Sequence, residues 1–206
     1  MTTISRRELL QRVAGLMGGA ISAPAMLGIL QGCKPSPVSG WKPLFLTEPQ
    51  GASVAEIADI MIPRTDTPGA KDLGVPAFID LMLKDVYQDA DRTRFITGLS
   101  ELEALARGEH EKDFMALDQE KRASLVQRVH DAAVAEAKDL PPGAALLRRP
   151  FILITKELTL LGYFASETGA TKVLQYEAVP GAFHACVPLA EAGNGHTWAG
   201  ETSLRF

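Results

Sequence analysis

The stretch that decides the fold is LLRRPFILITKELTLLGYF, at residues 146–164. Its apolar side chains recur at helical spacing, in the series Leu147, Phe151, Ile154, Leu158 and Leu161. The run FILI alone could form a β-strand, but about 18 residues without a turn signal favour a helix. Since the flanking residues are apolar as well, we predict that this segment is the central helix of an all-α domain.

A second helix is predicted from Thr47 onward. Thr47 is a capping residue, Gln50 can bond back to it, and Pro49 suits a first turn. Apolar residues then follow at the intervals of one helix face: Val54, Ile57, Ala58 and Met61. Pro63 should end this helix, and the turn-rich segment RTDTPGAKDLGVP follows at 64–76.

Three more helices complete a predicted bundle of about five. One begins at Pro76, and its expected buried stripe is Phe78, Ile79, Met82, Leu83 and Val86. The other two cover residues 91–107 and 118–138, the latter with Asp118 as its N-cap. Residues 47–168 are therefore predicted to form one compact helical domain.

Residues 169–206 are predicted to form an irregular C-terminal arm, because glycine and proline replace the helical pattern. A free chain could not bury aromatic side chains regularly in such a segment, whereas an interface with a partner could. The residues assigned to this partner interface are Tyr163, Phe164, Tyr176, Pro180, Phe183, Cys186 and Trp198. The inner stripe of the preceding helix is predicted to form this domain's own core, and a docking surface for a partner is the alternative.

The N-terminal residues 1–33 have the features of a twin-arginine export signal. Arg6 and Arg7 precede an uncharged stretch, Val13 to Gly32, that is rich in glycine and therefore weakly helical. An uncleaved membrane anchor is the alternative, although a permanent span would normally be more hydrophobic. The predicted location is the periplasm, reached in the folded state.

The signal ends in Leu-Gln-Gly-Cys, which resembles a lipobox with Cys33 as the acylated residue. Residues 34–46 contain three prolines, one glycine and two serines, and are predicted to be an extended tether. If Cys33 carries lipid, Cys186 is the odd thiol, which could pair with a partner chain or lie buried and inert. One remaining thiol excludes an internal disulfide framework and a cysteine-based metal cluster.

The net charge and the absence of cofactor motifs exclude several classes of function. The whole chain has a formal net charge of −4; residues 1–12 hold 3 of 21 basic and 1 of 25 acidic residues, which leaves 18 against 24, or −6. An acidic domain has no electrostatic reason to bind nucleic acid. The four histidines show no metal-ligand spacing, no glycine-rich segment has the context of a dinucleotide site, and Cys-x-x-Cys-His is absent from the sequence. We therefore expect neither a cofactor in this chain nor catalysis by it alone.

Two segments, 46–83 and 155–188, resemble the gluconate 2-dehydrogenase subunit 3 family, most specifically in the loop Asp-Thr-Pro-Gly-Ala at 66–70 and in residues 158–181. The resemblance implies a small subunit without a cofactor. It implies binding to a large FAD-dependent dehydrogenase of the glucose–methanol–choline type, often with a multihaem cytochrome c, and an export signal that serves both chains. The resemblance also implies why a folded protein is exported: the partner flavoprotein must fold around FAD in the cytoplasm.

Three classes of function stay open at this point. The first is the non-catalytic subunit of a sugar or sugar-alcohol dehydrogenase, which escorts and stabilises the flavoprotein. The second is a free-standing enzyme with an unrecognised site. The third is a periplasmic lipoprotein with an unrelated binding role.

Overall fold

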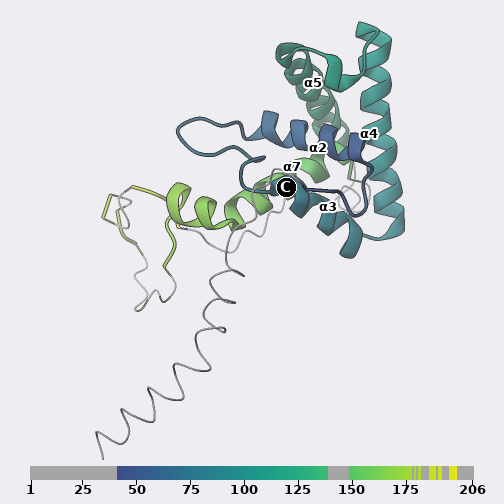
Figure 1. Ribbon diagram of the computed structural model, residues 1–206. Coiled ribbons are helices and arrows are strands. Elements are labelled where there is room, and N and C mark those ends of the chain that lie inside the picture. Colours follow the sequence, from purple (N-terminus) through teal and green to yellow (C-terminus); the bar gives the residue numbers. More distant parts are fainter. Residues whose placement is uncertain are drawn as a thin grey trace, which may run out of the picture. The chain divides into compact units, whose positions relative to one another are not determined.

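The computed structural model describes residues 41–138 and 149–177, and in the arm residues 179, 181, 186–188, 190–191 and 195–198. The chain divides into two units, 1–37 and 38–206, and only the second contains described residues (Figure 1). The predicted export signal, with Arg6, Arg7 and Cys33, therefore lies outside the described residues.

The described part of the chain is helical, which confirms the all-α prediction. Its α-helices are α2 (Glu48–Met61), α3 (Val75–Asp85), α4 (Asp89–His110), α5 (Gln119–Lys138) and α7 (Phe151–Ala165). A 3-10 helix, η1 (Phe114–Ala116), precedes α5, and a π-helix, η2 (Gly169–Val173), follows α7. Neither of these short elements was predicted. No helix among the described residues combines the length and hydrophobicity that a membrane span requires.

Helix α7 is central, as predicted, and contacts α2, α3, α4 and α5 (Figure 1). It begins at Phe151 instead of residue 146, because Pro150 has extended ψ and serves as the N-cap. Leu147 lies outside the described residues. The buried set also differs from the predicted stripe: Leu161 is only half-buried. Neighbours on several sides bury Phe151, Ile152, Ile154, Thr155, Leu158, Thr159 and Tyr163.

The predicted helix ends are largely confirmed. Thr47 and Gln50 form a reciprocal capping box on α2, which ends at Met61, shortly before Pro63. The Asp118 carboxylate accepts a 2.9 Å hydrogen bond from the Lys121 backbone N–H at the start of α5. Helix α4 extends beyond the predicted 91–107 at both ends.

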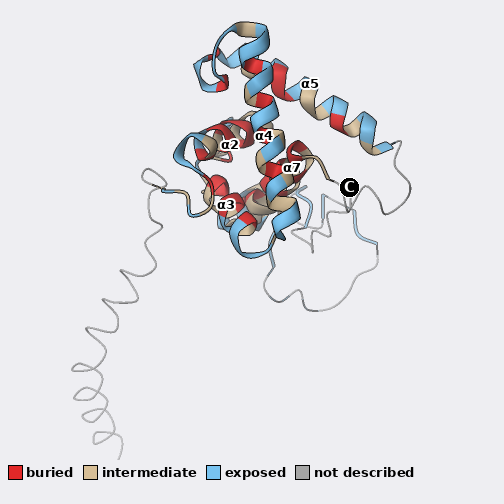
Figure 2. Cartoon of the chain, turned by 90° about the vertical axis from the view of Figure 1, so that its right-hand side faces the viewer, coloured by how far each residue is buried: buried red, intermediate tan, exposed pale blue. Residues whose placement is uncertain are grey.

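Helix α3 corrects one detail of the predicted core. It begins at Val75, behind Gly74, whose φ of 74° is in the left-handed region that favours glycine. Val86, which was expected in the buried stripe, is the C-cap residue and is 62% exposed. The helix ends before Val86 can turn toward the core. Figure 2 shows the buried residues of α2, α3, α4 and α7 on the faces that turn toward one another.

The end of the predicted tether belongs to the folded unit. The fully buried Asp80 carboxylate on α3 accepts hydrogen bonds from the backbone N–H groups of Leu44 (2.6 Å), Phe45 (3.2 Å) and Leu46 (2.8 Å). The Leu46 side chain is itself 5% exposed. The predicted boundary at residue 46 is therefore wrong, because a buried carboxylate on α3 holds this segment in place.

The arm also begins later than predicted. After α7 ends at Ala165, the chain continues through η2 to Val173, so residue 169 does not mark the loss of helical structure. A Cβ atom at Gly169 would lie 2.0 Å from the Tyr163 carbonyl oxygen. Only glycine therefore fits the close passage from α7 into η2.

Candidate functional site

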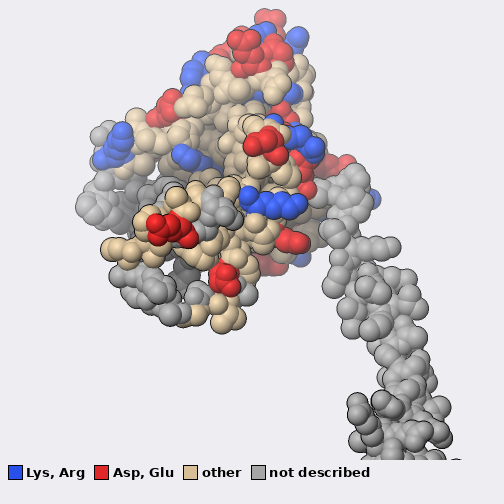
Figure 3. Space-filling model, turned by 90° about the vertical axis from the view of Figure 1, so that its left-hand side faces the viewer, with Lys and Arg blue, Asp and Glu red and all other residues tan. Residues whose placement is uncertain are grey.

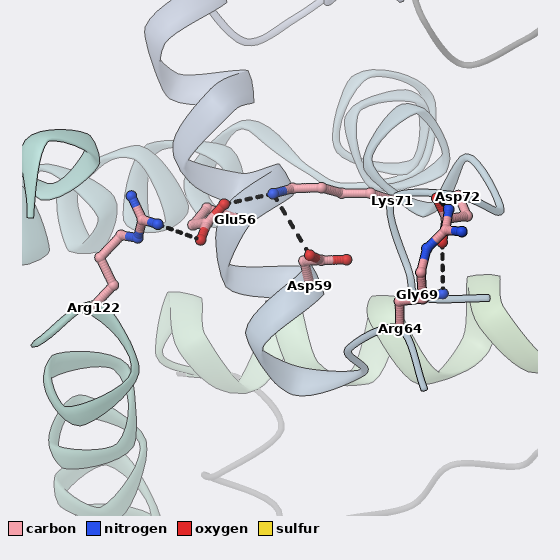
Figure 4. A network of polar contacts seen from close by, with 7 residues as sticks. All are labelled: Glu56, Asp59, Arg64, Gly69, Lys71, Asp72 and Arg122. Carbon is pink, nitrogen blue, oxygen red and sulfur yellow. Dashed lines mark hydrogen bonds and ion pairs between the residues drawn. The ribbon is translucent and has the colours of Figure 1, made fainter. Parts of the chain in front are cut away.

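Residues 64–72, which we call the braced loop, connect α2 to α3 and contain the exposed residues Arg64, Thr65 and Asp66. The tip is closed locally, because the Thr65 N–H donates to the Thr67 carbonyl at 3.0 Å and the Thr65 hydroxyl donates to the Asp66 carboxylate at 2.9 Å. Figure 4 shows the polar network that joins this loop to α2 and α5. Loops held on a rigid scaffold are frequent recognition elements.

Asp72 closes the base of the loop. Its carboxylate pairs with the Arg64 guanidinium and accepts a 2.9 Å hydrogen bond from the Gly69 backbone N–H. The hydrogen bond from Arg64 is the main reason why the pKa of Asp72 is lowered, with a smaller contribution from the Gly69 N–H against the opposing effect of burial. A lowered pKa means that this pairing stabilises the fold above the unfolded carboxyl's pKa of about 4. The stabilisation is lost as the pH falls through the folded value.

Glu56 on α2 links the loop to α5. One carboxylate oxygen contacts the Lys71 ammonium at 2.5 Å, and the other contacts the Arg122 guanidinium at 3.1 Å. The Glu56 and Arg122 side chains are only 12% and 18% exposed, whereas Lys71 is 40% exposed and also lies 3.7 Å from Asp59. The Glu56–Arg122 pair is thus shielded from water, and shielded pairs cost more to break than surface pairs.

Tyr163 braces the loop from the core side. Its side chain is 2% exposed, and its hydroxyl donates a 2.9 Å hydrogen bond to the Pro68 carbonyl. The assignment of Tyr163 to an accessible partner interface is therefore wrong, because α7 directs this ring inward. Phe164, the next residue, is half-buried and stacks edge-on against it, with 5.3 Å between ring centroids.

The arm exposes apolar side chains, as its composition predicted. Tyr176 is 58% exposed, Val179 79%, Val187 43% and Trp198 48%. Cys186 is a free and exposed cysteine, so the alternative of a buried thiol is wrong within this chain. Pro180 and Phe183 lie outside the described residues. An exposed Trp and Tyr on one segment are typical of a protein-binding surface.

The arm is attached to the end of the helical unit near the braced loop. The Gln175 N–H donates to the Thr197 carbonyl at 2.8 Å, and Gln175 forms a parallel bridge with Trp198. His196 Nδ1 lies 3.1 Å from the Val173 carbonyl oxygen, so it donates a hydrogen bond from that nitrogen. In Figure 1 the loop and the arm lie on the side toward which the C-terminal end of α7 points. The described part of this face carries scattered charges of both signs among uncharged surface (Figure 3).

The loop presents exposed polar side chains on a braced backbone, and the arm presents exposed apolar ones. Over the described ranges, no three His, Cys, Asp or Glu side chains are grouped so that they could hold a metal ion. The carboxylates around the loop are engaged with Arg64, Lys71 and Arg122. These ion pairs fix the position of the exposed loop. The candidate site is therefore a composite surface of the braced loop and the arm.

We predict that Glu56→Gln lowers the free energy of unfolding by about 2 kcal/mol, because it leaves the shielded Arg122 without its carboxylate. The matched control is Glu109→Gln. Glu109 pairs with Arg128 at 2.7 Å, but these side chains are 37% and 57% exposed, so its loss should cost less than about 0.5 kcal/mol. Urea denaturation of both variants measures the difference. Equal midpoints for the two variants would show that the shielded Glu56–Arg122 pair adds no more stability than the surface pair.

One comparison with known proteins gives a match. The family model described as gluconate 2-dehydrogenase subunit 3 matches residues 48–181, which is well over half of the chain. The matched region begins at α2, includes the braced loop and α7, and ends in the arm. No curated protein and no solved structure matches the chain.

Proposed function

The chain belongs to the gluconate 2-dehydrogenase subunit 3 family, and from this premise we propose that it is the non-catalytic small subunit of an FAD-dependent sugar or sugar-alcohol dehydrogenase. Membership makes it an accessory subunit of a dehydrogenase complex, associated with other subunits of that complex. The proposal adds that catalysis and FAD reside in a larger partner chain, which this subunit stabilises and escorts through twin-arginine export.

The observation that carries the proposal is the exposed apolar surface of the arm. Tyr176 and Trp198 lie near each other, because Gln175 is bridged to Trp198, and each exposes about half of its side chain. Tyr and Trp are enriched among the few residues that supply most of the binding energy in protein interfaces. The braced loop presents Arg64 and Asp66 from a fixed backbone, which suits polar contacts at the rim of such an interface.

Escort follows from the chemistry of the cofactor. A flavoprotein must fold around FAD where FAD is made, so a route for folded proteins is needed to export it. The paired Arg6 and Arg7 on this chain provide the address for that route. A twin-arginine signal on a chain without a recognisable cofactor motif is explained if the exported cargo is its partner. The periplasm is the proposed location of the complex.

Three finer features belong to the same proposal. Acylation at Cys33 would attach the complex to the membrane, and a multihaem cytochrome c would accept the electrons. The exposed Cys186 would bond to the partner or be covered by it, since an odd thiol in an oxidising compartment often pairs between chains. The alternative function is a periplasmic lipoprotein with an unrelated binding role, for which the arm would have a different partner.

We predict that a tagged form of this chain, expressed with its genomic neighbours, co-purifies with a larger yellow chain that contains FAD. Changing Tyr176 and Trp198 to serine together should reduce the recovered flavin at least tenfold, because two central aromatic contacts are worth about 2 kcal/mol each. The chain freed of its partner should be colourless and should not reduce dye with sugars.

The matched control is Val86→Ser, which removes a 62% exposed apolar side chain from α3, outside the arm. It should leave the flavin recovery unchanged. Sugar-dependent dye reduction by the isolated chain would refute the non-catalytic role. Equal flavin recovery with the arm variant and the wild type would refute the arm as the interface.

A further inference from the structure

A small cleft lies between α2, α5 and α7, apart from the arm. It has a volume of about 220 Å³, and its walls are formed by Ile60, Met61, Ala123, Val126, Gln127, His130, Lys156 and Leu160. Pockets for drug-sized ligands have volumes of roughly 300–1,000 Å³, and a cavity of about 150 Å³ holds benzene. The size therefore suits a compact ligand with a short carbon chain. Five of the eight lining residues are apolar.

Lys156 provides a positive charge at this cleft. Its ammonium nitrogen lies 3.0 Å from His130 Nε2. An ammonium group can only donate, so His130 Nε2 is the acceptor and carries no proton. The ring proton is then on Nδ1, which faces the Asp131 carboxylate at 3.2 Å. The geometry thus fixes the tautomer of His130 and leaves further ammonium N–H groups of Lys156 for another acceptor.

Among the described residues, Lys156 has no carboxylate within ion-pair distance. The nearby acidic groups are engaged elsewhere: Asp131 accepts from Gln127 and faces His130, Glu157 pairs with Arg149, and Asp59 lies beside Lys71. Lys156 is half-buried, and a charged group with restricted access to water is stabilised by an opposite charge beside it. Its neutral partner His130 does not supply one.

We propose that this cleft binds a small monocarboxylate with a short alkyl chain. The carboxylate would pair with the Lys156 ammonium, and the alkyl chain would lie against Met61, Val126 and Leu160. Asp131 does not line the cleft; its side chain is 64% exposed, and it faces the opposite ring nitrogen of His130. A sugar acid with a hydroxyl on each carbon fits less well, because the apolar walls offer its hydroxyl groups no partners. The proposal does not depend on the proposed function.

The test is a titration of the purified chain with acetate, butyrate and hexanoate, followed by two-dimensional NMR. The amide signals of Val126, His130 and Lys156 should shift saturably. Because each buried methylene strengthens binding by about fourfold and butyrate has two methylenes more than acetate, butyrate should bind about fifteenfold more tightly than acetate. This dependence on chain length needs no variant.

Lys156→Gln should weaken butyrate binding at least tenfold, because a charge-assisted hydrogen bond is lost. Lys138→Gln, which removes the same charge from an exposed site at the end of α5, should leave it unchanged. Linear shifts that are alike for the three acids would overturn the proposal. Equal butyrate affinity of the wild type and Lys156→Gln would overturn it as well.

Discussion

Replacement of Asp80 by alanine is expected to lower the free energy of unfolding by about 3 kcal/mol. The fully buried carboxylate accepts hydrogen bonds from three consecutive backbone N–H groups, those of Leu44, Phe45 and Leu46. Hydrogen bonds to a charged group contribute more than neutral ones, and a buried N–H without a partner costs about 1–3 kcal/mol. Leu46 is buried, so its N–H cannot simply return to water.

The same variant should release the segment that precedes α2. The Trp41 ring and Pro43 pack against Gly51 of α2, where an added Cβ atom would lie 3.1 Å from Trp41 and 2.7 Å from Pro43. In a Trp198→Phe background Trp41 is the remaining tryptophan, since the chain has two. Its fluorescence should shift to the red in Asp80→Ala before global unfolding. Equilibrium urea denaturation measures the stability.

Two further variants separate the charge from the side-chain volume. Asp80→Asn keeps one acceptor oxygen but turns an amide donor toward backbone donors, so it should also destabilise, by about 1–2 kcal/mol. Asp85→Ala removes an exposed carboxylate from the last turn of the same helix and should change stability by less than about 0.5 kcal/mol. Equal stability of Asp80→Ala and the wild type would show that Asp80 does not hold the segment.

The sequence predicted the helices well because their signals are local. The capping box of Thr47 and Gln50, the stop at Pro63 and the cap at Asp118 each depend on residues within four positions of one another. The central position of α7 followed from apolar residues on most of its surface. The all-α fold could therefore be predicted from local patterns in the sequence. The family was predicted separately, from the resemblance of residues 46–83 and 155–188.

The predictions failed where the deciding contact is distant in sequence. Tyr163 has the composition of an interface residue, but its hydroxyl binds the Pro68 carbonyl, 95 positions earlier. The tether boundary at residue 46 was wrong because Asp80 binds a segment about 35 residues earlier in the chain. The Glu56 network joins three segments in the same way. Neither spacing nor propensity can reveal such pairs in a single sequence.

The resemblance gave one indication that periodicity could not. It singled out the Asp-Thr-Pro-Gly-Ala loop at 66–70; in the structure Pro68 of this loop accepts a hydrogen bond from Tyr163, and Lys71, directly after it, pairs with Glu56. The arm was predicted from composition, and its exposed Tyr176 and Trp198 agree with that reasoning. The identity of the partner that covers Tyr176 and Trp198 depends on a second chain, so it stays a proposal.

The paired Arg6 and Arg7 allow a direct test of the escort role. Changing both to lysine should strand this chain in the cytoplasm, although the charge is kept. Twin-arginine recognition depends on the planar guanidinium with its fixed set of donors, which lysine does not reproduce.

If the flavoprotein lacks its own signal, it should stay behind as well, folded and with FAD bound. We expect its periplasmic activity to fall at least tenfold while the cytoplasmic activity rises. Fractionation of cells that express both chains, with a dye-reduction assay in each compartment, measures this. The control is Arg12→Lys, outside the pair, which should leave export intact. A flavoprotein that reaches the periplasm normally with both arginines replaced would refute the escort role, whereas the arm and the Asp80 contact would be unaffected by that result.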